Sequence, residues 1–240
     1  MKPVFFVPCI AVRVALCTLR LRGLKNVNAA LFQKQINDAT KIGVWHITEA
    51  EDFFLEKVPL QRTITHPHKR LQHLAGRYLL PQLFPAFPLE LVEIADTRKP
   101  FLPGEPFHFS ISHCGNYAAA IVSMENRVGV DIEIPHPRIG NIKHKFLSPG
   151  EQHIVSAVHS DDITGLTMAW SVKEAVFKWF GEGEVDFIGH MQITAVNKTA
   201  TGYTTECLFK KDRPVLLRVK STMHGNNNLS RIVTDPMVLD

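Results

Sequence analysis

Runs of apolar and polar residues along the first half of the chain predict a mixture of strands and helices. Segments rich in apolar, β-branched and aromatic residues predict strands, at residues 42–48, 90–95, 107–112, 117–123 and 127–134. Apolar residues at i, i+3, i+4 and i+7 predict a helix over residues 63–80, with Pro67 near its start and the proline-rich residues 81–88 after it. A shorter helix is predicted at residues 49–55, and residues 97–106 are predicted to be a turn-rich loop.

Capping signals place two further helices in the second half of the chain. The sequence SPGE, which opens residues 148–159, has the spacing of a capping box with proline at the first helical position. A second helix is predicted over residues 162–180, capped by its first aspartate and stopped by Gly181. Residues 187–233 are predicted to be β-rich, with a charged turn at residues 210–214. The fold class is therefore α+β, and no Rossmann glycine pattern or P-loop is present.

The charge of the chain is concentrated at its N-terminus. The 240 residues carry a net charge of +4 and are 45% hydrophobic, which suits one large domain or two small packed halves. Residues 1–37 contain six cations and no acid, so the remainder of the chain is close to neutral. This distribution argues against a nucleic-acid-binding protein, because no basic patch interleaved with aromatic residues accompanies the charge.

The N-terminal segment has some features of a targeting sequence but lacks others. A lysine is followed by an apolar run to about residue 19, but Arg13 interrupts that run and no small-residue cleavage site follows. The run is also too short and broken to cross a membrane. Residues 1–37 are therefore predicted to be a poorly ordered extension. The four cysteines show no CxxC spacing, so we expect a cytoplasmic protein with no membrane partner.

Two carboxylates stand side by side on the strand predicted at residues 127–134 (RVGVDIEI). Its valines and isoleucines fall on one face, and Gly129, Asp131 and Glu133 fall on the other. Such a pair is most often a solvated strand face. Here the strand lies among strongly apolar neighbours, and the glycine leaves room beside the acids. The pair is therefore a candidate site for a cation.

A third carboxylate lies on the helix predicted at residues 162–180. Trp170, Glu174 and Lys178 are spaced at i, i+4 and i+8 and share one face. The ordinary reading is a surface ion pair, but this helix is apolar nearly all round, and a buried charge pair requires another reason to exist. Three carboxylates with no histidine or thiolate suit Mg²⁺, which commonly completes its shell with substrate phosphates. Cations available for such phosphates are those of Arg70, Lys99 and His113.

These stretches, taken in order, resemble the 4′-phosphopantetheinyl transferase superfamily, Sfp type. The paired signature of that family is similar to VGVDIE at residues 128–133 and to WSVKEA with Lys178 at residues 170–178. Further similarities are the arginine-bearing helix at residues 68–80, Lys99-Pro100, FSISH at residues 109–113 and FLSPGE at residues 146–151. The resemblance covers roughly residues 45–187. Arg98 stands where the family has a glycine, and Cys114 stands where it has a serine; we interpret Cys114 as a small, half-buried thiol.

The resemblance implies a Mg²⁺-dependent transfer of 4′-phosphopantetheine from coenzyme A to a serine of an apo acyl or peptidyl carrier protein, with release of 3′,5′-ADP. Asp131, Glu133 and Glu174 would bind Mg²⁺. Glu174, Glu151 or a metal-bound water would accept the serine proton, and Lys178 would stabilise developing charge. The nucleotide would be bound by Arg70, Lys99, Ser112, His113 and Lys178.

The resemblance also implies two similar α+β halves related by a pseudo-twofold, with the active site in the cleft between them. The first half would span residues 38–126, and the second half, residues 127–240, would carry the metal site. We expect a monomer that serves fatty-acid or secondary-metabolite biosynthesis. Two alternatives stay open: an inactive module that binds carrier proteins, and a Mg²⁺-dependent nucleotide phosphohydrolase.

Overall fold

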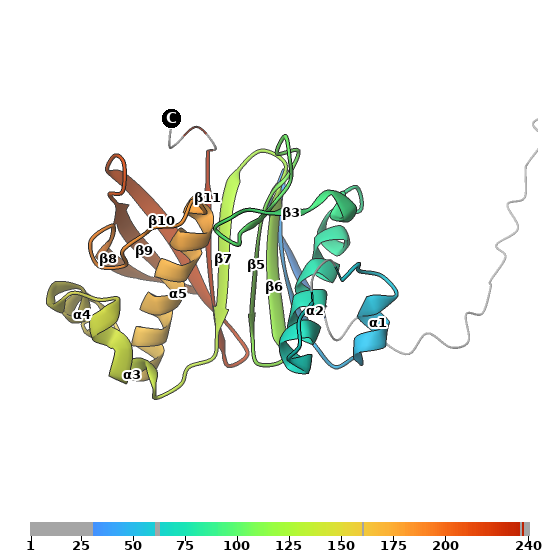
Figure 1. Cartoon of the computed structure of the whole chain (residues 1–240). Coiled ribbons are helices and arrows are strands. Elements are labelled where there is room, and N and C mark those ends of the chain that lie inside the picture. The colour runs from blue at the N-terminus through green and yellow to red at the C-terminus, as the bar shows by residue number, and fades with distance from the viewer. Residues whose placement is uncertain (1–30, 61–62, 160, 236, 238–240) are drawn as a thin grey trace, which may run out of the picture.

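Two antiparallel sheets pack face to face, and helices cover the outer face of each (Figure 1). The computed structural model describes residues 31–60, 63–159, 161–235 and 237. The strands are β1 (Leu31–Asn37), β2 (Thr40–His46), β3 (Glu93–Ile94), β4 (Pro100–Phe101), β5 (His108–Cys114), β6 (Tyr117–Ser123), β7 (Arg127–Glu133), β8 (Met191–Thr199), β9 (Gly202–Phe209), β10 (Val215–His224) and β11 (Asn227–Thr234). The helices are α1 (Glu51–Leu55), α2 (Pro67–Leu83), α3 (Ile139–Ile142), α4 (Pro149–Ser156) and α5 (Asp162–Phe180), with 3₁₀ turns η2 (Leu89–Leu91) and η3 (Lys143–Lys145). The α+β prediction is confirmed.

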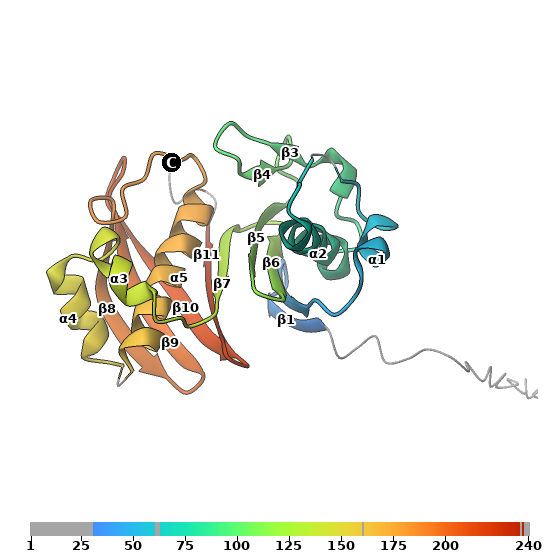
Figure 2. The same cartoon turned by 60° about the horizontal axis from the view of Figure 1, so that its bottom comes forward.

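The first sheet has the strand order β1-β2-β6-β5, and α2 covers one of its faces. Figure 2 shows α2 nearly end-on, to the right of β5 and β6, with α1 beside it. The helix begins at Pro67 as predicted, and the side chain of His66 accepts a hydrogen bond from the Lys69 amide as its N-cap. It continues through Pro81 to Leu83, past the predicted end, because Leu83 is fully buried against the sheet and holds the last turn in place.

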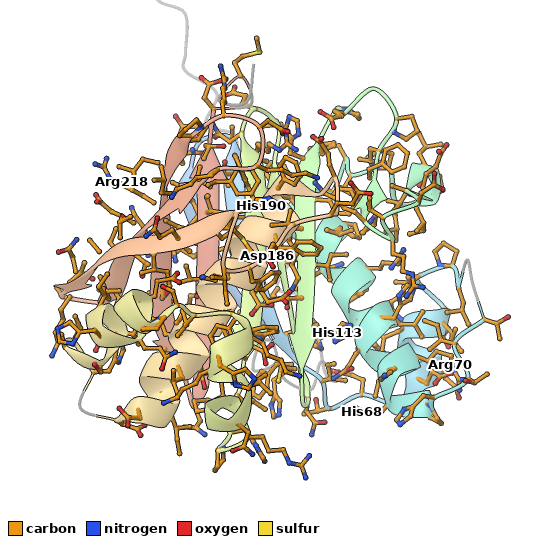
Figure 3. The ribbon with its side chains drawn as sticks, turned by 60° about the vertical axis from the view of Figure 1, so that its left-hand side comes forward. His68, Arg70, His113, Asp186, His190 and Arg218 are labelled. Atoms are coloured by element: carbon orange, nitrogen blue, oxygen red, sulfur yellow. The ribbon has the colours of Figure 1, made fainter. Side chains whose placement is uncertain are left out.

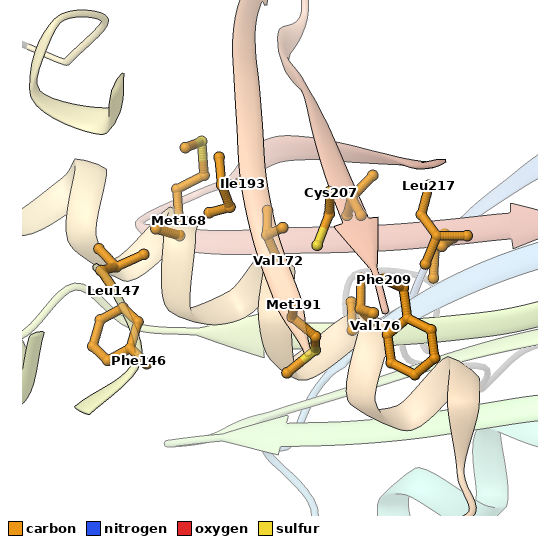
Figure 4. Packing of buried hydrophobic residues seen from close by; sticks show 14 of the residues in the cluster. Phe146, Leu147, Met168, Val172, Val176, Met191, Ile193, Cys207, Phe209 and Leu217 are labelled. Atoms are coloured by element: carbon orange, nitrogen blue, oxygen red, sulfur yellow. The ribbon is translucent and has the colours of Figure 1, made fainter. Parts of the chain in front are cut away.

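The second sheet has the order β7-β11-β10-β9-β8, and α5 lies across its outer face. Apolar side chains of α5 pack onto those of β8, β9 and β10 in a continuous core (Figure 4). The helix is capped by Asp161, one residue before the predicted cap, whose carboxylate accepts hydrogen bonds from the Ile163 and Thr164 amides. It ends at Gly181 in the left-handed conformation (φ 78°), as the sequence predicts.

A third apolar cluster joins the two sheets. Side chains from β2 and β6 pack on those of β7 and β11, and the cluster includes Ile42, Ile121, Val130 and Ile132, each at most 1% exposed. As a result β7 lies beside β5, although the two strands belong to different sheets. Residues close to the chain midpoint, near Asn126, connect the two sheets.

Four local features differ from the sequence prediction. Residues 1–30 lie outside the described residues, but Leu31–Asn37, which fell within the expected extension, forms the edge strand β1. This strand (LFQKQIN) is mostly exposed, so it has little apolar pattern to reveal it. The strand predicted at residues 90–95 is mostly η2 with only the two-residue β3, and α3 and β4 were not predicted. None of the helices within the described ranges is both long and apolar enough to cross a membrane.

Candidate active site

The helix that carries the third acid of the predicted site, α5, packs unusually close to β7, which carries the first two. Asp131 and Glu133 lie on the face of β7 that looks toward α5, as predicted. The opposite face of the strand is apolar and packs between the two sheets. At Gly129 an added Cβ would overlap the carbonyl of Ala175 and would lie 2.8 Å from the Cβ of Trp179. Only glycine permits this approach. The glycine therefore sets the distance at which Glu174 and Lys178 meet the strand.

Asp131 is at the centre of the cluster and is only 2% exposed. Its Oδ1 accepts hydrogen bonds from Lys178 Nζ at 2.6 Å and from Ser112 Oγ at 2.8 Å. Its Oδ2 is buried and has no hydrogen-bond partner in the described part of the chain. A buried carboxylate oxygen without a partner is costly, and a cation is the group that would satisfy it.

Glu133 and Glu174 lie close enough to Asp131 for the three charges to act on one another. Burial raises the pKa of Glu133, and the negative charge of Asp131 raises it further. Burial, opposed by the charge of Lys178 and helped by those of Asp131 and Glu133, raises the pKa of Glu174 to about 7. Glu133 accepts a hydrogen bond from Trp170 Nε1 at 3.2 Å. The Glu174 side chain has no hydrogen bond or ion pair within the described residues.

The three carboxylates fit a hard divalent cation in donor type, charge and burial. Burial and mutual repulsion raise the pKa values of Glu133 and Glu174, and Asp131 Oδ2 has no hydrogen-bond partner among the described residues, so the cluster lacks positive charge beyond that of Lys178. In their present positions, however, no three acidic, histidine or cysteine side chains among the described residues are close enough together to hold a metal ion. The metal role of these residues therefore stays a prediction.

Strand β5 connects the first sheet to this cluster through two serines. Strand β7 pairs with β11 on one side only, so its amides on the other side need acceptors. The Ser110 hydroxyl accepts from the Val130 amide at 3.1 Å, and the Ser112 hydroxyl accepts from the Ile132 amide at 3.3 Å. Ser112 also accepts from Lys178 Nζ at 2.9 Å. Ser112 is therefore in direct contact with Asp131 and Lys178 of the acidic cluster, whereas the sequence predicted only a contact with the nucleotide.

A cavity of about 240 Å³ opens beside Lys178. It is bounded by the segment after β3, by β5 and by the end of α5, and its lining residues are Thr97, Arg98, Lys99, Pro100, Phe109, Ser110, Ile111, Phe177, Lys178 and Gly181. Burial and the charge of Arg127 lower the pKa of Lys99 to about 8. An added Cβ at Gly181 would clash with the Lys99 ammonium, so that ammonium lies directly against the C-terminus of α5. The cavity has cations on two sides and suits a phosphate-bearing ligand.

A smaller cavity of about 130 Å³ shares residues with the first and carries cations that the sequence did not single out. It is lined by His73, Arg77, Arg98, Pro100, Ile111 and His113. Partial burial and the charge of Lys178 lower the pKa of His113. His73 and Arg77 come from α2 and are spaced at i, i+4, with a hydrogen bond of 3.1 Å between them. Their spacing on the helix that carries Arg70 was the available signal.

Arg70 does not reach this region. Its guanidinium forms an ion pair with Glu51 at 2.8 Å and donates to the Ile64 carbonyl at 2.9 Å. Figure 3 shows Arg70 on the outer side of α2, away from His113. Arg77, seven residues further along the same helix, lines the cavity in its place. The expected nucleotide contact of Arg70 is therefore not supported by its position.

Glu151 occupies a structural position in the core. It is 2% exposed, and its Oε1 pairs with Lys173 Nζ at 2.6 Å, while Lys173 is fully buried. Oε1 also accepts from the Ile193 amide at 2.9 Å, and Oε2 accepts from the Ser148 amide at 2.8 Å in the predicted capping box. Both oxygens are therefore occupied by groups that hold α4, α5 and β8 together. This position does not support a role for Glu151 as proton acceptor.

Cys114 is a half-buried free thiol, as interpreted from the sequence. Burial, together with the nearby carboxylates of Glu133 and Asp131, raises the pKa of this thiol to about 11. At neutral pH it is protonated and a poor nucleophile.

The part of the chain that carries the acidic cluster is similar to a family of known proteins. Residues 127–229, from β7 into β11, match the family model of the 4′-phosphopantetheinyl transferase superfamily. The match includes Asp131, Glu133, Glu174 and Lys178, and it ends before the C-terminus of the last strand.

Of three similar proteins, two are named as 4′-phosphopantetheinyl transferases and one as a component of enterobactin synthase. 4′-Phosphopantetheinyl transferase AcpT of Escherichia coli O157:H7 is 34% identical over 116 residues, which are 47% of this chain and 59% of that protein. Enterobactin synthase component D of Salmonella austin is 33% identical over 134 residues, 55% of this chain and 56% of its own. 4′-Phosphopantetheinyl transferase of Bacillus subtilis is 37% identical over 92 residues, 38% of this chain and 41% of its own. The chain thus spans little more than half the length of the first two relatives.

Proposed function

We propose that this protein transfers the 4′-phosphopantetheine group from coenzyme A to a serine hydroxyl of an apo acyl or peptidyl carrier protein and releases 3′,5′-ADP. One observation carries the proposal: a buried carboxylate with an unsatisfied oxygen (Asp131) and two half-buried carboxylates (Glu133 and Glu174) lie beside a cavity with cations on two sides. The names of the relatives support the same reaction class.

The chain's own residues divide the work of binding between charge and position. In the proposal Lys99, whose ammonium lies against the C-terminus of α5, binds the nucleotide phosphates. Arg98, Arg77 and His113 add cationic or hydrogen-bonding groups from the adjoining cavity. Asp131, Glu133 and Glu174 would hold Mg²⁺, which when bound neutralises charge on the pyrophosphate and acts as a Lewis acid. Catalysis is then mostly positioning and electrostatic stabilisation.

The transfer step moves one phosphoryl group and one proton. The serine oxygen forms a bond to the phosphorus next to the pantetheine, and the bond from that phosphorus to the bridging oxygen breaks, so that 3′,5′-ADP leaves. Glu174 is the proposed acceptor of the serine proton, because its side chain is not engaged by any described residue, whereas both oxygens of Glu151 are occupied. Lys178, held by Asp131 and Ser112, is the cation available to the leaving phosphate.

Intact mass spectrometry of carrier proteins tests the proposal. The chain is incubated with coenzyme A, MgCl₂ and each of several apo carriers of the acyl and peptidyl types. We expect the carrier to gain the mass of one phosphopantetheine group, and a carrier whose acceptor serine is replaced by alanine to gain nothing. Chelation of Mg²⁺ with EDTA should abolish the gain.

Two variants with the same chemical change separate the site from the rest of the surface. Glu174→Gln should lose at least about a hundredfold in rate, and Glu90→Gln, at an exposed glutamate of η2, should act like the unmodified chain. No mass gain with any carrier while coenzyme A still binds would establish an inactive binding module. Release of 3′,5′-ADP in the absence of a carrier would establish a phosphohydrolase.

A further inference from the structure

A second basic cavity lies on the opposite face of the C-terminal sheet from α5. Its volume is about 310 Å³, and its lining residues are Lys34, Thr199, Thr201, Tyr203, Thr204, Lys220, Ser221, Thr222 and Arg231. Arg231 pairs with Val130 across β11 and β7, and paired residues share a face. Val130 faces the first sheet, whereas Asp131, the next residue, faces α5. The cavity is therefore separated from the proposed active site by the thickness of a sheet.

The cations of this cavity are arranged without a counter-charge. Lys220 of β10 stands directly opposite Arg231 of β11, and Lys34 approaches from β1. Like charges directly opposite each other on neighbouring strands are destabilising. No aspartate or glutamate is among the lining residues. Lys220 and Arg231 therefore repel each other at a place where no lining residue neutralises their charge.

The neighbouring position on the same strand shows the usual arrangement. Arg218, two residues before Lys220 on the same face of β10, pairs with Glu206 of β9 at 3.3 Å. In Figure 3 Arg218 projects outward from this sheet at the upper left. At the next position on that face of β9, opposite Lys220, the residue is Thr204 instead of an acid. Lys220 therefore has a threonine hydroxyl opposite it on β9, where Arg218 has a carboxylate.

Arg231 is desolvated as well as unpaired. Its side chain is partly buried, burial lowers the pKa of its guanidinium, and no described residue makes a hydrogen bond or ion pair with it. A guanidinium withdrawn from water without a partner is costly unless a ligand supplies the acceptors. The hydroxyls of threonines from β8, β9 and β10 and of Tyr203 line the rest of the cavity and can donate to the same ligand.

We propose that this cavity, bounded by Lys34, Lys220 and Arg231, is a binding site for a small phosphate-bearing anion. A phosphate group has the acceptor oxygens that a planar guanidinium and several hydroxyls recognise together. The volume is at the lower end of the range of small-molecule sites, which suits a phosphorylated metabolite and not an extended polymer. The proposal does not depend on the transferase reaction.

The test uses inorganic phosphate as the probe and a reporter inside the cavity. The chain has three tyrosines, and only Tyr203 lines this cavity. The full chain is labelled with 3-fluorotyrosine, the Tyr203 resonance is assigned from Tyr203→Phe, and phosphate is titrated against chloride at constant ionic strength. We expect the Tyr203 resonance to shift and saturate, while Tyr78, which lies in the core of the first sheet, serves as an internal reference. Phosphate bound at the other site would leave the Tyr203 resonance unchanged.

Three variants decide the outcome. Arg231→Met and Lys220→Gln should each weaken the saturable shift roughly tenfold or more. Arg218→Gln removes one charge from the same face of β10 but outside the cavity, and it should leave the shift unchanged. An unchanged Tyr78 resonance shows that each variant is folded, and Lys220, being exposed, provides a substitution that the fold tolerates. A shift that does not saturate, or one that is equal in Arg231→Met and the unmodified chain, would refute the site.

Discussion

The ammonium group of Lys99 sits against the last turn of α5, where burial and Arg127 lower its pKa to about 8. A bound phosphate favours the charged form of a lysine, so nucleotide binding should require Lys99 to be protonated. Below pH 8 the proton is already present in the free protein. As the pH rises above 8 it must be taken up on binding, and the affinity falls by up to tenfold per pH unit.

Calorimetric titration of 3′,5′-ADP between pH 6.5 and 9.5 measures this effect. The phosphates of the nucleotide are fully ionised above about pH 7, so they do not produce a step near pH 8. Lys99→Met should bind weakly at every pH and should show no fall above pH 8. A fall of the same size in Lys99→Met would mean that another group titrates, and the assignment of Lys99 would be wrong.

At the scale of single elements, the C-terminus of α5 positions Lys99 through Gly181. This residue has a φ of 78°, and an added Cβ would clash with the lysine side chain. Gly181→Ala should therefore cost about 1 kcal/mol of stability from the left-handed backbone and should also displace Lys99. The second effect should appear as weaker binding of 3′,5′-ADP.

Gly104 provides a matched control for this prediction. Its φ is 73°, close to that of Gly181, but an added Cβ there meets no atom within 4 Å. Gly104→Ala should lower the melting temperature by a similar amount and leave nucleotide affinity unchanged. Equal losses of affinity in the two variants would show that backbone strain alone, and not the position of Lys99, is responsible.

The buried pair of Glu151 and Lys173 connects α4 to α5. Lys173 Nζ also donates to the carbonyls of Phe146 and Phe187, so both charges are fully hydrogen-bonded. Removing one partner leaves an uncompensated buried group, and Glu151→Gln should destabilise the fold by about 3 kcal/mol. For a chain of this size the melting temperature should fall by roughly 6–12 °C.

The same variant separates a structural role from a catalytic one. Measured well below its melting temperature, Glu151→Gln should retain a kcat within a few-fold of the unmodified chain, and Lys173→Met should do the same. Glu174→Gln, in contrast, should melt at or above the temperature of the unmodified chain, because it removes charge repulsion among three carboxylates. A large loss of kcat in a folded Glu151→Gln protein would restore Glu151 as a catalytic candidate.

At the scale of the whole molecule, the sequence predicted those parts of the structure that depend on local pattern. The capping box of α4, the stop at Gly181 and the apolar face of β7 are encoded over a few residues, and the structure has them. The edge strand β1 was missed because an exposed strand needs no apolar periodicity. Its position is fixed by pairing with β2, which sequence pattern does not specify.

The site shows the same division between local and long-range information. The spacing of Glu174 and Lys178 along α5 identifies their shared face, but the contact of Lys178 with Asp131 depends on the packing of α5 over Gly129. Arg70 and Arg77 lie two turns apart on one helix, and local pattern alone cannot tell which of them lies level with the cavity. Glu151 is a good helix cap and a plausible acid on sequence grounds, and only its long-range pairing with Lys173 distinguishes the two roles.

The cluster between the two sheets should make the molecule unfold as one unit. Its side chains come from both sheets and are almost completely buried, so opening either sheet exposes them.

Leu74→Ala, in the core between α2 and the first sheet, should cost about 3 kcal/mol. Hydrogen exchange followed by mass spectrometry should then show the slowest amides of β9 and β10, in the other sheet, accelerated by about a hundredfold. Val172→Ala, in the core of the second sheet, is the reciprocal control and should accelerate the slowest amides of β2 and β6. Acceleration confined to the sheet that carries the substitution would show that the halves unfold independently and that the shared cluster does not couple them.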